Sequence, residues 1–284
     1  MGVINVTTDS FSDTQRISNV SDGVRRAVQL FEDGADILDI GGMSNVTNRP
    51  AISAEEEAER VAPLVARLAL ETSALISVDT YRPVVAAAAI EAGAHIINDI
   101  SGLADEHLAL ICASSGAALV IMHTRVAPKQ KLHDEGLYND DVGGDVLSFL
   151  KQRIDRAVQL GMDREQIIVD PGPDFSKTPA QTVDALRGID KLQPLQRPIL
   201  MAISRKDFIG AITSRRPTER LAGTLAALAD GVERGGHIFR LHDVREAADY
   251  LTVRAHLSGK RTTPPGLRVP EDLRREPAEA PPVA

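Results

Sequence analysis

Polar side chains follow the end of nearly every short apolar run in this sequence. The first run, Gly2–Val6, leads into a polar segment that extends to Asp13. Short β-branched runs of this kind are typical of buried parallel strands, and α/β proteins bind ligands at the carboxyl ends of such strands. We therefore expect one shared site formed by Asn5, Asp39, Asp79, Asn98, Asp170, Lys206, Arg240 and His242.

These residues divide into two kinds of chemistry. Asp79, Asn98 and Asp170 offer hydrogen-bond acceptors, which suit a flat heterocycle that carries amino and ring N–H donors. Lys206 can donate to a carbonyl or a nitrogen of the same ring. For any single strand-end Asp, the alternative is a helix N-cap.

The other group could hold an anion. Arg240 lies two residues before His242, at the end of the last apolar run. An arginine there, next to a helix N-terminus, is suited to a phosphate or another oxyanion. The alternative for both residues is a surface ion pair with Asp243 or Glu246.

The elements that must position these side chains alternate between strand and helix patterns. Ser53 followed by three Glu residues, for example, predicts a helix start. Eight such units fit an α/β fold of the (β/α)8 TIM-barrel type over residues 1–258, with a doubly wound open sheet as the alternative. The predicted strands are Gly2–Val6, 35–40, 75–78, 95–97, 118–122, 167–169, 198–203 and 237–241.

Composition limits the classes of protein to consider. The net charge of −8 argues against a nucleic-acid or anionic-membrane partner, and no apolar run reaches the roughly 20 residues of a membrane span. No signal peptide is recognisable, and the lone Cys112 suits a reducing cytoplasm, where we expect the protein to act. Six of the 16 prolines lie in residues 259–284, which predicts a disordered Pro-rich tail.

Several segments, in this order along the chain, resemble the dihydropteroate synthase family. The segments are residues 5–13 (Asn-Val-Thr-Thr-Asp-Ser-Phe-Ser-Asp), 39–42 (Asp-Ile-Gly-Gly), 76–80 (Ile-Ser-Val-Asp-Thr), 98–102 (Asn-Asp-Ile-Ser-Gly), 170–172 (Asp-Pro-Gly), 204–206 (Ser-Arg-Lys) and 240–244 (Arg-Leu-His-Asp-Val). The resemblance implies a transferase that joins a dihydropterin pyrophosphate to p-aminobenzoate, in a pterin-binding TIM barrel that forms a homodimer.

The resemblance also implies a role for each matching residue. Asp79, Asn98, Asp170 and Lys206 match the pterin pocket, with Met122 as a packing wall and Asp39 at the floor. Asn5, Arg240 and His242 match the pyrophosphate site, where Mg²⁺ is expected with the leaving group, and Asn5 is its expected ligand in the chain. Lys206, Arg240 and His242 are the expected catalytic residues. The residues that match the p-aminobenzoate site and its mobile loops are Phe11, Arg49, Pro50, Ser204, Arg205 and Asp207.

The chain departs from the family pattern near the second substrate. Met43 replaces a Glu, and about three residues are inserted before Arg49. Asp207 stands where a Ser commonly helps to hold the aminobenzoate carboxylate, and a carboxylate there is unfavourable unless Arg205 or a water intervenes. Its alternative role is an N-cap. The segment 170–177 replaces a glycine-rich run before the lysine, which alters the backbone freedom of that loop.

These departures leave three functions to compare. The first is a working dihydropteroate synthase with a remodelled p-aminobenzoate pocket that discriminates against sulfonamides. The second is a paralogue that binds pterin but has lost the condensation or changed its acceptor. The third is a pterin-dependent methyltransferase, against which segment 204–206 and the intact first loop argue.

Overall fold

The computed structural model describes residues 1–6, 20–43, 52–130, 132, 134–138 and 140–275 of the chain. These residues fall into two compact units, Met1–Ala248 and Asp249–Ala284, and the boundary lies within the last long helix. In the part of the chain that is described, no helix has the length and apolar character to cross a membrane.

The first unit is built on parallel strands. Strands β1 to β6 pair in chain order in one sheet, and β7 pairs with β8. Single parallel bridges join Val169 to Ile199 and Leu241 to Gly2, so the strands close into a ring. The strands are β1 (Gly2–Asn5), β2 (Ile37–Gly41), β3 (Leu75–Asp79), β4 (Ile96–Asp99), β5 (Ala118–Met122), β6 (Ile167–Asp170), β7 (Leu200–Met201) and β8 (Ile238–Phe239).

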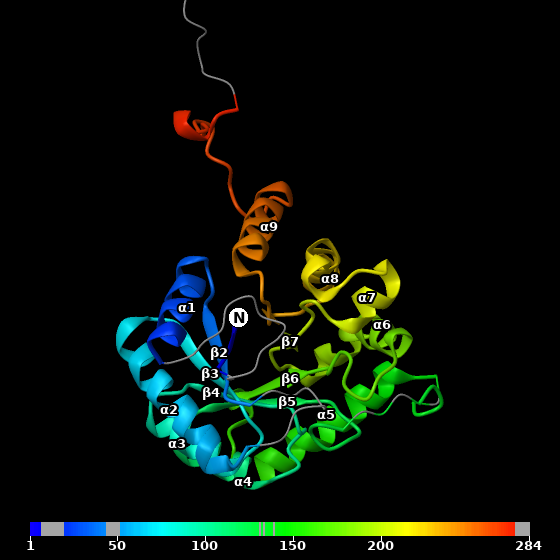
Figure 1. Cartoon of the computed structure of the whole chain (residues 1–284). Helices are drawn as coiled ribbons and strands as arrows, with labels where there is room; N and C mark the ends of the chain where they lie inside the picture. The colour runs from blue at the N-terminus through cyan, green and yellow to red at the C-terminus, as the bar shows by residue number, and fades with distance from the viewer. Residues whose placement is uncertain (7–19, 44–51, 131, 133, 139, 276–284) are drawn as a thin grey trace, which may run out of the picture. The chain divides into compact units, whose positions relative to one another are not determined.

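Helices follow the strands and, in the first unit, lie outside the ring (Figure 1). They are α1 (Val20–Glu32), α2 (Ala54–Glu71), α3 (Pro83–Glu91), α4 (His107–Ser115), α5 (Val142–Gln159), α6 (Pro179–Arg187), α7 (Asp207–Thr213), α8 (Leu221–Glu233) and α9 (Val244–Leu257). Ser53 caps α2 as predicted, because its Oγ accepts a hydrogen bond from the Glu56 amide at 3.1 Å. The fold is therefore the predicted (β/α)8 barrel.

The barrel interior changes from apolar to polar along the strands. Its apolar layer consists of Ile37, Ile96, Val120, Ile168, Leu200 and Ala202. Because side chains in a strand alternate between faces, the inward residue two positions after Ile37 is Asp39, and the one after Ile96 is Asn98. Polar side chains thus gather at the carboxyl end of the barrel, above an apolar floor.

Two parts of the structure differ from the sequence prediction. Helix α7 was not predicted, because its sequence contains Gly210 and β-branched residues and has no apolar stripe. Strands β7 and β8 are shorter than predicted. The described part of the Pro-rich tail contains one short 3₁₀ turn, Glu271–Leu273, and the domain boundary at 258/259 stays a prediction.

Candidate active site

Arg240 connects the end of β8 to the ends of β2 and β3 across the mouth of the barrel. Its Nε donates to Asp39 Oδ2 at 2.6 Å, and its Nη2 donates to Asp79 Oδ2 at 3.1 Å. The Arg240 side chain is 19% exposed, whereas Asp39 is fully buried. Burial opposes the charge, but the two carboxylates outweigh it and raise the pKa of Arg240. Arg240 therefore does not form the surface ion pair that was the alternative.

Asp39 lies at the floor of this network, as the resemblance implied. Its Oδ1 accepts from Ser77 Oγ at 2.6 Å, and Asn98 Nδ2 approaches both of its oxygens at 3.4 Å. A carboxylate held on three sides is a fixed anchor, so Asp39 orients Asn98 and Arg240. We name Arg240, Asp39, Asp79, Asn98 and Ser77 the mouth network.

Asp170 is the second buried carboxylate of the mouth. It lies beside Met122, its register partner on β5, and its Oδ1 accepts from the Gly172 amide at 2.7 Å. Burial raises the pKa of Asp170 to about 6, although the Gly172 amide, Lys206 and other cations oppose the shift. This carboxyl is therefore largely ionised at neutral pH and becomes protonated under mildly acidic conditions.

Lys206 joins β7 to the loop after β6. Its ammonium donates to the Pro173 carbonyl at 3.1 Å and lies 4.6 Å from the centre of the Phe175 ring. Burial lowers the pKa of Lys206, while Asp174 and Asp170 oppose the change. The ammonium thus lies over an aromatic ring, within electrostatic reach of the buried Asp170 carboxylate.

Ser204 and His242 meet at the ends of β7 and β8. Ser204 Oγ accepts from the His242 amide at 3.1 Å and is 3.0 Å from His242 Nδ1. Arg205 binds Asp243 through Nε at 3.0 Å and through Nη2 at 2.5 Å. Asp243 is therefore the partner of Arg205, and it fixes the segment between β8 and α9.

Asn5 places an amide oxygen at the mouth from β1. A Cβ atom on Gly41 would lie 3.4 Å from Asn5 Oδ1 and 3.9 Å from Asp79 Cβ, so this oxygen lies over Gly41, close to Asp79. Within the described ranges, no group of three or more His, Cys, Asp or Glu side chains could hold a metal ion. A single amide oxygen suits Mg²⁺ that arrives with phosphate oxygens, because Mg²⁺ keeps few protein ligands.

Asp207 is the first residue of α7 and not its N-cap, which is Lys206. Its carboxylate is 81% exposed and accepts from Arg220 Nη1 at 3.0 Å, so Arg220 and not Arg205 balances its charge. Its amide donates to Asp174 Oδ2 at 2.5 Å. Asp174 and Asp207, both of which depart from the family pattern, are therefore neighbours here.

The loop after β6 keeps a left-handed backbone at alternate residues. Gly172 has a φ of 65°, Asp174 of 65° and Ser176 of 54°. Glycine adopts this conformation without strain, and Asp and Ser do so less readily. Side-chain bonds compensate, because Ser176 Oγ accepts from the Arg125 amide at 3.0 Å and Asp174 bonds to Thr182. The loop lacks the glycines of the family pattern at Asp174 and Ser176, and these side-chain hydrogen bonds hold its backbone in place instead.

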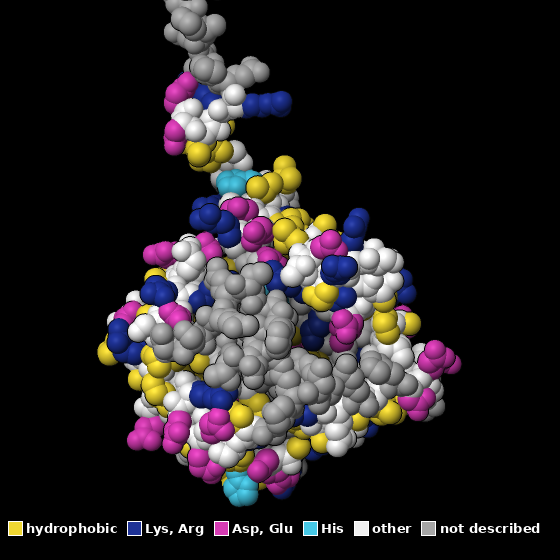
Figure 2. Space-filling model, viewed as in Figure 1, with side chains coloured by type: hydrophobic (Ala, Val, Ile, Leu, Met, Phe, Trp, Pro, Cys, Tyr) yellow, Lys and Arg dark blue, Asp and Glu magenta, His cyan; other side chains and the backbone are white. Residues whose placement is uncertain are grey.

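Three expected loop residues, Phe11, Arg49 and Pro50, lie outside the described residues. Met43, which replaces the expected Glu, is described and buried. Acidic and basic side chains are interspersed among the described residues of the face in Figure 2.

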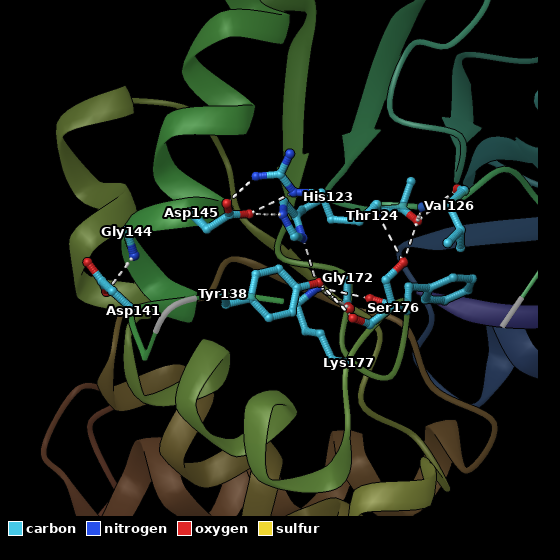
Figure 3. A network of polar contacts seen from close by, with 12 residues as sticks. His123, Thr124, Val126, Tyr138, Asp141, Gly144, Asp145, Gly172, Ser176 and Lys177 are labelled. Atoms are coloured by element: carbon cyan, nitrogen blue, oxygen red, sulfur yellow. Dashed lines mark hydrogen bonds and ion pairs between the residues drawn. The ribbon is translucent and has the colours of Figure 1, made fainter. Parts of the chain in front are cut away.

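The sequence reasoning missed a buried group behind the mouth. Lys177 is 1% exposed, and its ammonium lies 2.8 Å from His123 Nδ1 (Figure 3). His123 Nε2 lies 2.9 Å from Asp145 Oδ1. Burial, helped by Lys177, lowers the pKa of His123 to about 3, so its buried ring is neutral. The sequence offered one signal for this pair. His123 directly follows β5, and Lys177 comes soon after β6, the neighbouring strand.

A cavity of about 270 Å³ lies between the loops after β5 and β6. Ile100 and Phe175 give it apolar walls, and Asp174, Asp207 and Lys129 contribute charged groups. Its Phe175 wall is the ring over which the Lys206 ammonium lies. An acceptor that enters beside the pterin-type site would therefore meet an apolar wall and a carboxylate rim.

Comparisons with known proteins agree with this geometry. Residues 1–242 match the model of the family described as Pterin binding enzyme. The dihydropteroate synthase of Bacillus subtilis is 39% identical over 249 residues, which cover 87% of this chain and 84% of that protein. The Escherichia coli dihydropteroate synthase is 36% identical over 261 residues, which cover 92% of each.

Solved structures give the same relation. The chain resembles Yersinia pestis dihydropteroate synthase in a sulfonamide drug complex, with a TM-score of 0.84, 31% identity and coverage of 92% of this chain and 93% of that one. It also resembles Xanthomonas albilineans dihydropteroate synthase in complex with 7,8-dihydropteroate, with a TM-score of 0.80, 36% identity and 93% coverage of both chains.

Proposed function

Because this chain belongs to the dihydropteroate synthase family, we propose that its strand-end side chains carry out the reaction of that family. The reaction condenses 6-hydroxymethyl-7,8-dihydropterin diphosphate with p-aminobenzoate and gives 7,8-dihydropteroate and pyrophosphate for folate synthesis. The observation that carries the assignment of roles is the convergence of Asp170, Lys206 and the mouth network at one end of the barrel.

In this proposal the pterin binds between Asp170, Asn98 and Lys206, with Met122 as a packing wall. The buried carboxylates accept hydrogen bonds from the amino and ring N–H groups of the pterin, and Lys206 donates to a ring acceptor. Asp170 must be ionised to accept fully, and its raised pKa still leaves it ionised at neutral pH. The negative carboxylates also stabilise the positive charge that develops on the pterin when the leaving group departs.

In this proposal Arg240 and His242 bind the diphosphate group of the substrate. A guanidinium has enough N–H donors to remain bonded to Asp39 and Asp79 and still donate to a phosphate oxygen. In the reaction the bond from the methylene carbon to the diphosphate oxygen breaks first, and the bond from the arylamine nitrogen to that carbon then forms. The arylamine releases one proton. Charge stabilisation of the leaving group and exclusion of water are the main requirements.

Mg²⁺ is proposed to accompany the diphosphate. Asn5 would hold it through Oδ1, together with oxygens of the substrate. The ion supplies charge neutralisation for the leaving group. The chain's own contribution is the Asn5 amide oxygen, which lies next to Gly41.

The p-aminobenzoate is proposed to approach from the side of Lys206, Ser204 and Phe175. Arg205 is bonded to Asp243, so its charge is partly used within the protein. The carboxylates of Asp174 and Asp207 repel an anionic acceptor, and Arg220 offsets part of this repulsion. A homodimer, inferred from the family resemblance, and a cytoplasmic location, inferred from the lone Cys112 and the lack of a recognisable signal peptide, complete the proposal.

The test is release of pyrophosphate from the dihydropterin diphosphate with Mg²⁺, measured with and without p-aminobenzoate. We expect pyrophosphate and dihydropteroate in equal amounts when both substrates are present. Binding of the pterin without formation of dihydropteroate would instead support the alternative of a paralogue with a lost or altered acceptor.

A further inference from the structure

The Lys177 ammonium is enclosed by neutral acceptors. Besides His123 Nδ1 at 2.8 Å, it donates to the Gly172 carbonyl at 2.9 Å and to the Phe175 carbonyl at 3.1 Å. These three acceptors satisfy the donors of an ammonium group. A buried lysine that holds two backbone carbonyls of one loop fixes the shape of that loop.

The imidazole of His123 connects this lysine to a carboxylate. Because Nδ1 accepts from Lys177, the proton of the neutral ring is on Nε2 and is donated to Asp145 Oδ1. Asp145 also binds Arg125, whose Nε lies 3.1 Å from Oδ1. The chain from Arg125 through Asp145 and His123 thus stabilises the charge of Lys177 without placing a carboxylate on it (Figure 3).

The loop held by Lys177 carries two contacts of the pterin site. The Gly172 amide donates to Asp170, and the Pro173 carbonyl accepts from Lys206. Lys177 binds the carbonyls of Gly172 and Phe175. The Pro173 carbonyl lies between these two carbonyls along the chain, and the Gly172 amide belongs to the first of these residues. The Phe175 ring also lies beneath the Lys206 ammonium.

The loop contains left-handed backbone, which needs hydrogen bonds to hold it in place. Asp174 and Ser176 have positive φ angles that L-residues adopt less readily than glycine does. The Tyr138 hydroxyl adds a second bond to the same loop, because it donates to the Ser176 carbonyl at 2.7 Å. A Cβ on Gly172 would collide with the His123 carbonyl, so the loop packs directly on the end of β5.

We propose that Lys177 is a positioning residue that sets the pterin pocket by clamping the loop from Gly172 to Phe175, with His123 and Asp145 as its support. Lys177 does not touch the substrate. It acts on Asp170 and Lys206 through the Gly172 amide and the Pro173 carbonyl. This inference rests on the proposed function for the identity of the ligand, a dihydropterin diphosphate.

The test compares two substitutions by Met. Each removes a side chain that donates hydrogen bonds to two backbone carbonyls. Lys177→Met removes the clamp. Gln166→Met is the matched control, since Gln166 Nε2 donates to the carbonyls of Cys112 at 3.0 Å and Ala117 at 2.9 Å, at the opposite end of the barrel. The readouts are the Kd of dihydropterin diphosphate with Mg²⁺ by calorimetry, both KM values, kcat and Tm.

For Lys177→Met we expect the Kd and KM of the dihydropterin diphosphate to rise about tenfold or more, as for other residues that orient ligand-binding groups. The KM of p-aminobenzoate should also rise, because Asp174 and Phe175 of the clamped loop line the acceptor cavity. Gln166→Met should lower Tm and leave both KM values unchanged. Partial unfolding lowers the concentration of active enzyme and hence kcat, but does not change KM, so a rise in KM that Gln166→Met does not share identifies positioning.

Unchanged pterin binding in folded Lys177→Met would overturn the inference, as would an equal effect of Gln166→Met. If Lys177→Met does not fold, Tyr138→Phe tests the same loop with the aromatic ring retained. It should raise the pterin Kd by a smaller factor, and no rise would count against the clamp. Calorimetry does not depend on turnover, so a wild-type chain that binds the pterin without condensation contradicts only the proposed function.

Discussion

Two partly or fully buried cations lie near the mouth of the barrel, and their partners are of opposite kinds. Arg240 is bonded to the carboxylates Asp39 and Asp79, and part of its side chain remains exposed. Lys177 is sealed from solvent and bonded to an imidazole nitrogen and two carbonyls. The Arg240 side chain is partly open to solvent, whereas Lys177 is only 1% exposed.

The difference indicates which network is suited to binding and which to shape. Carboxylate partners preserve the charge of Arg240 and orient it toward the mouth, so that an arriving anion completes its coordination. Neutral acceptors saturate Lys177 and connect it to the backbone. Burial alone therefore does not distinguish a group that acts on substrate from a group that positions others.

The largest expected effect comes from removing the exposed cation. Arg240→Met should lower kcat/KM by about 10³-fold, because the leaving group loses a preorganised donor. Lys177→Met should lower it by about tenfold, mainly through KM. Steady-state kinetics on both variants measure the difference.

Arg240→Lys is the control for charge. It keeps the positive charge but cannot bridge two carboxylates in the same planar geometry, so it should recover only part of the lost activity. Equal losses in Arg240→Met and Lys177→Met would contradict the distinction between the two networks.

A pH profile separates the regions next. The folded-state pKa of Asp170 is raised to about 6 by burial, so its acceptor function is present above that pH and is lost as the pH falls through it. The pterin KM should therefore rise about tenfold between about pH 7.5 and about pH 5. His123, with a pKa of about 3, stays neutral over this interval. Burial lowers the pKa of Lys177 to about 7, so Lys177 gains its proton as the pH falls, and the loss of pterin binding at low pH does not come from this lysine.

Asp170→Asn is the companion variant for this profile. It should bind pterin weakly at every pH, and its pterin KM should no longer change as the pH falls through about 6. A limb near pH 6 that persists in Asp170→Asn would assign the titration to another group.

The smallest effect is expected at the carboxylate rim, outside both networks. Asp207→Ser should lower the KM of p-aminobenzoate by about two- to threefold, since the Asp207 carboxylate is exposed and screened. The pterin KM should stay constant, and the gain should shrink at high ionic strength. A higher KM for p-aminobenzoate in Asp207→Ser would mean that Asp207 assists the acceptor.

Much of the site could be predicted because strands impose a simple geometry. Asp39, Asp79, Asn98 and Asp170 each occupy the inward position at the end of a parallel strand, and the closed barrel brings these positions together. Helix α7 could not be predicted in this way. Burial of Phe208 and Ile209 and bonds from Arg220 form it, and its sequence has no helical pattern.

The sequence by itself determined the barrel and the polar ends of its strands, because alternation along each strand and turns between units are local properties. Only the tertiary structure decided which charges meet. Arg240 and Asp39 are 201 residues apart in the chain, and Lys177 reaches His123 from the loop after the neighbouring strand, β6. Pairing of buried charges depends on distances of a few ångströms and on exclusion of water, and both exist only after the barrel has closed.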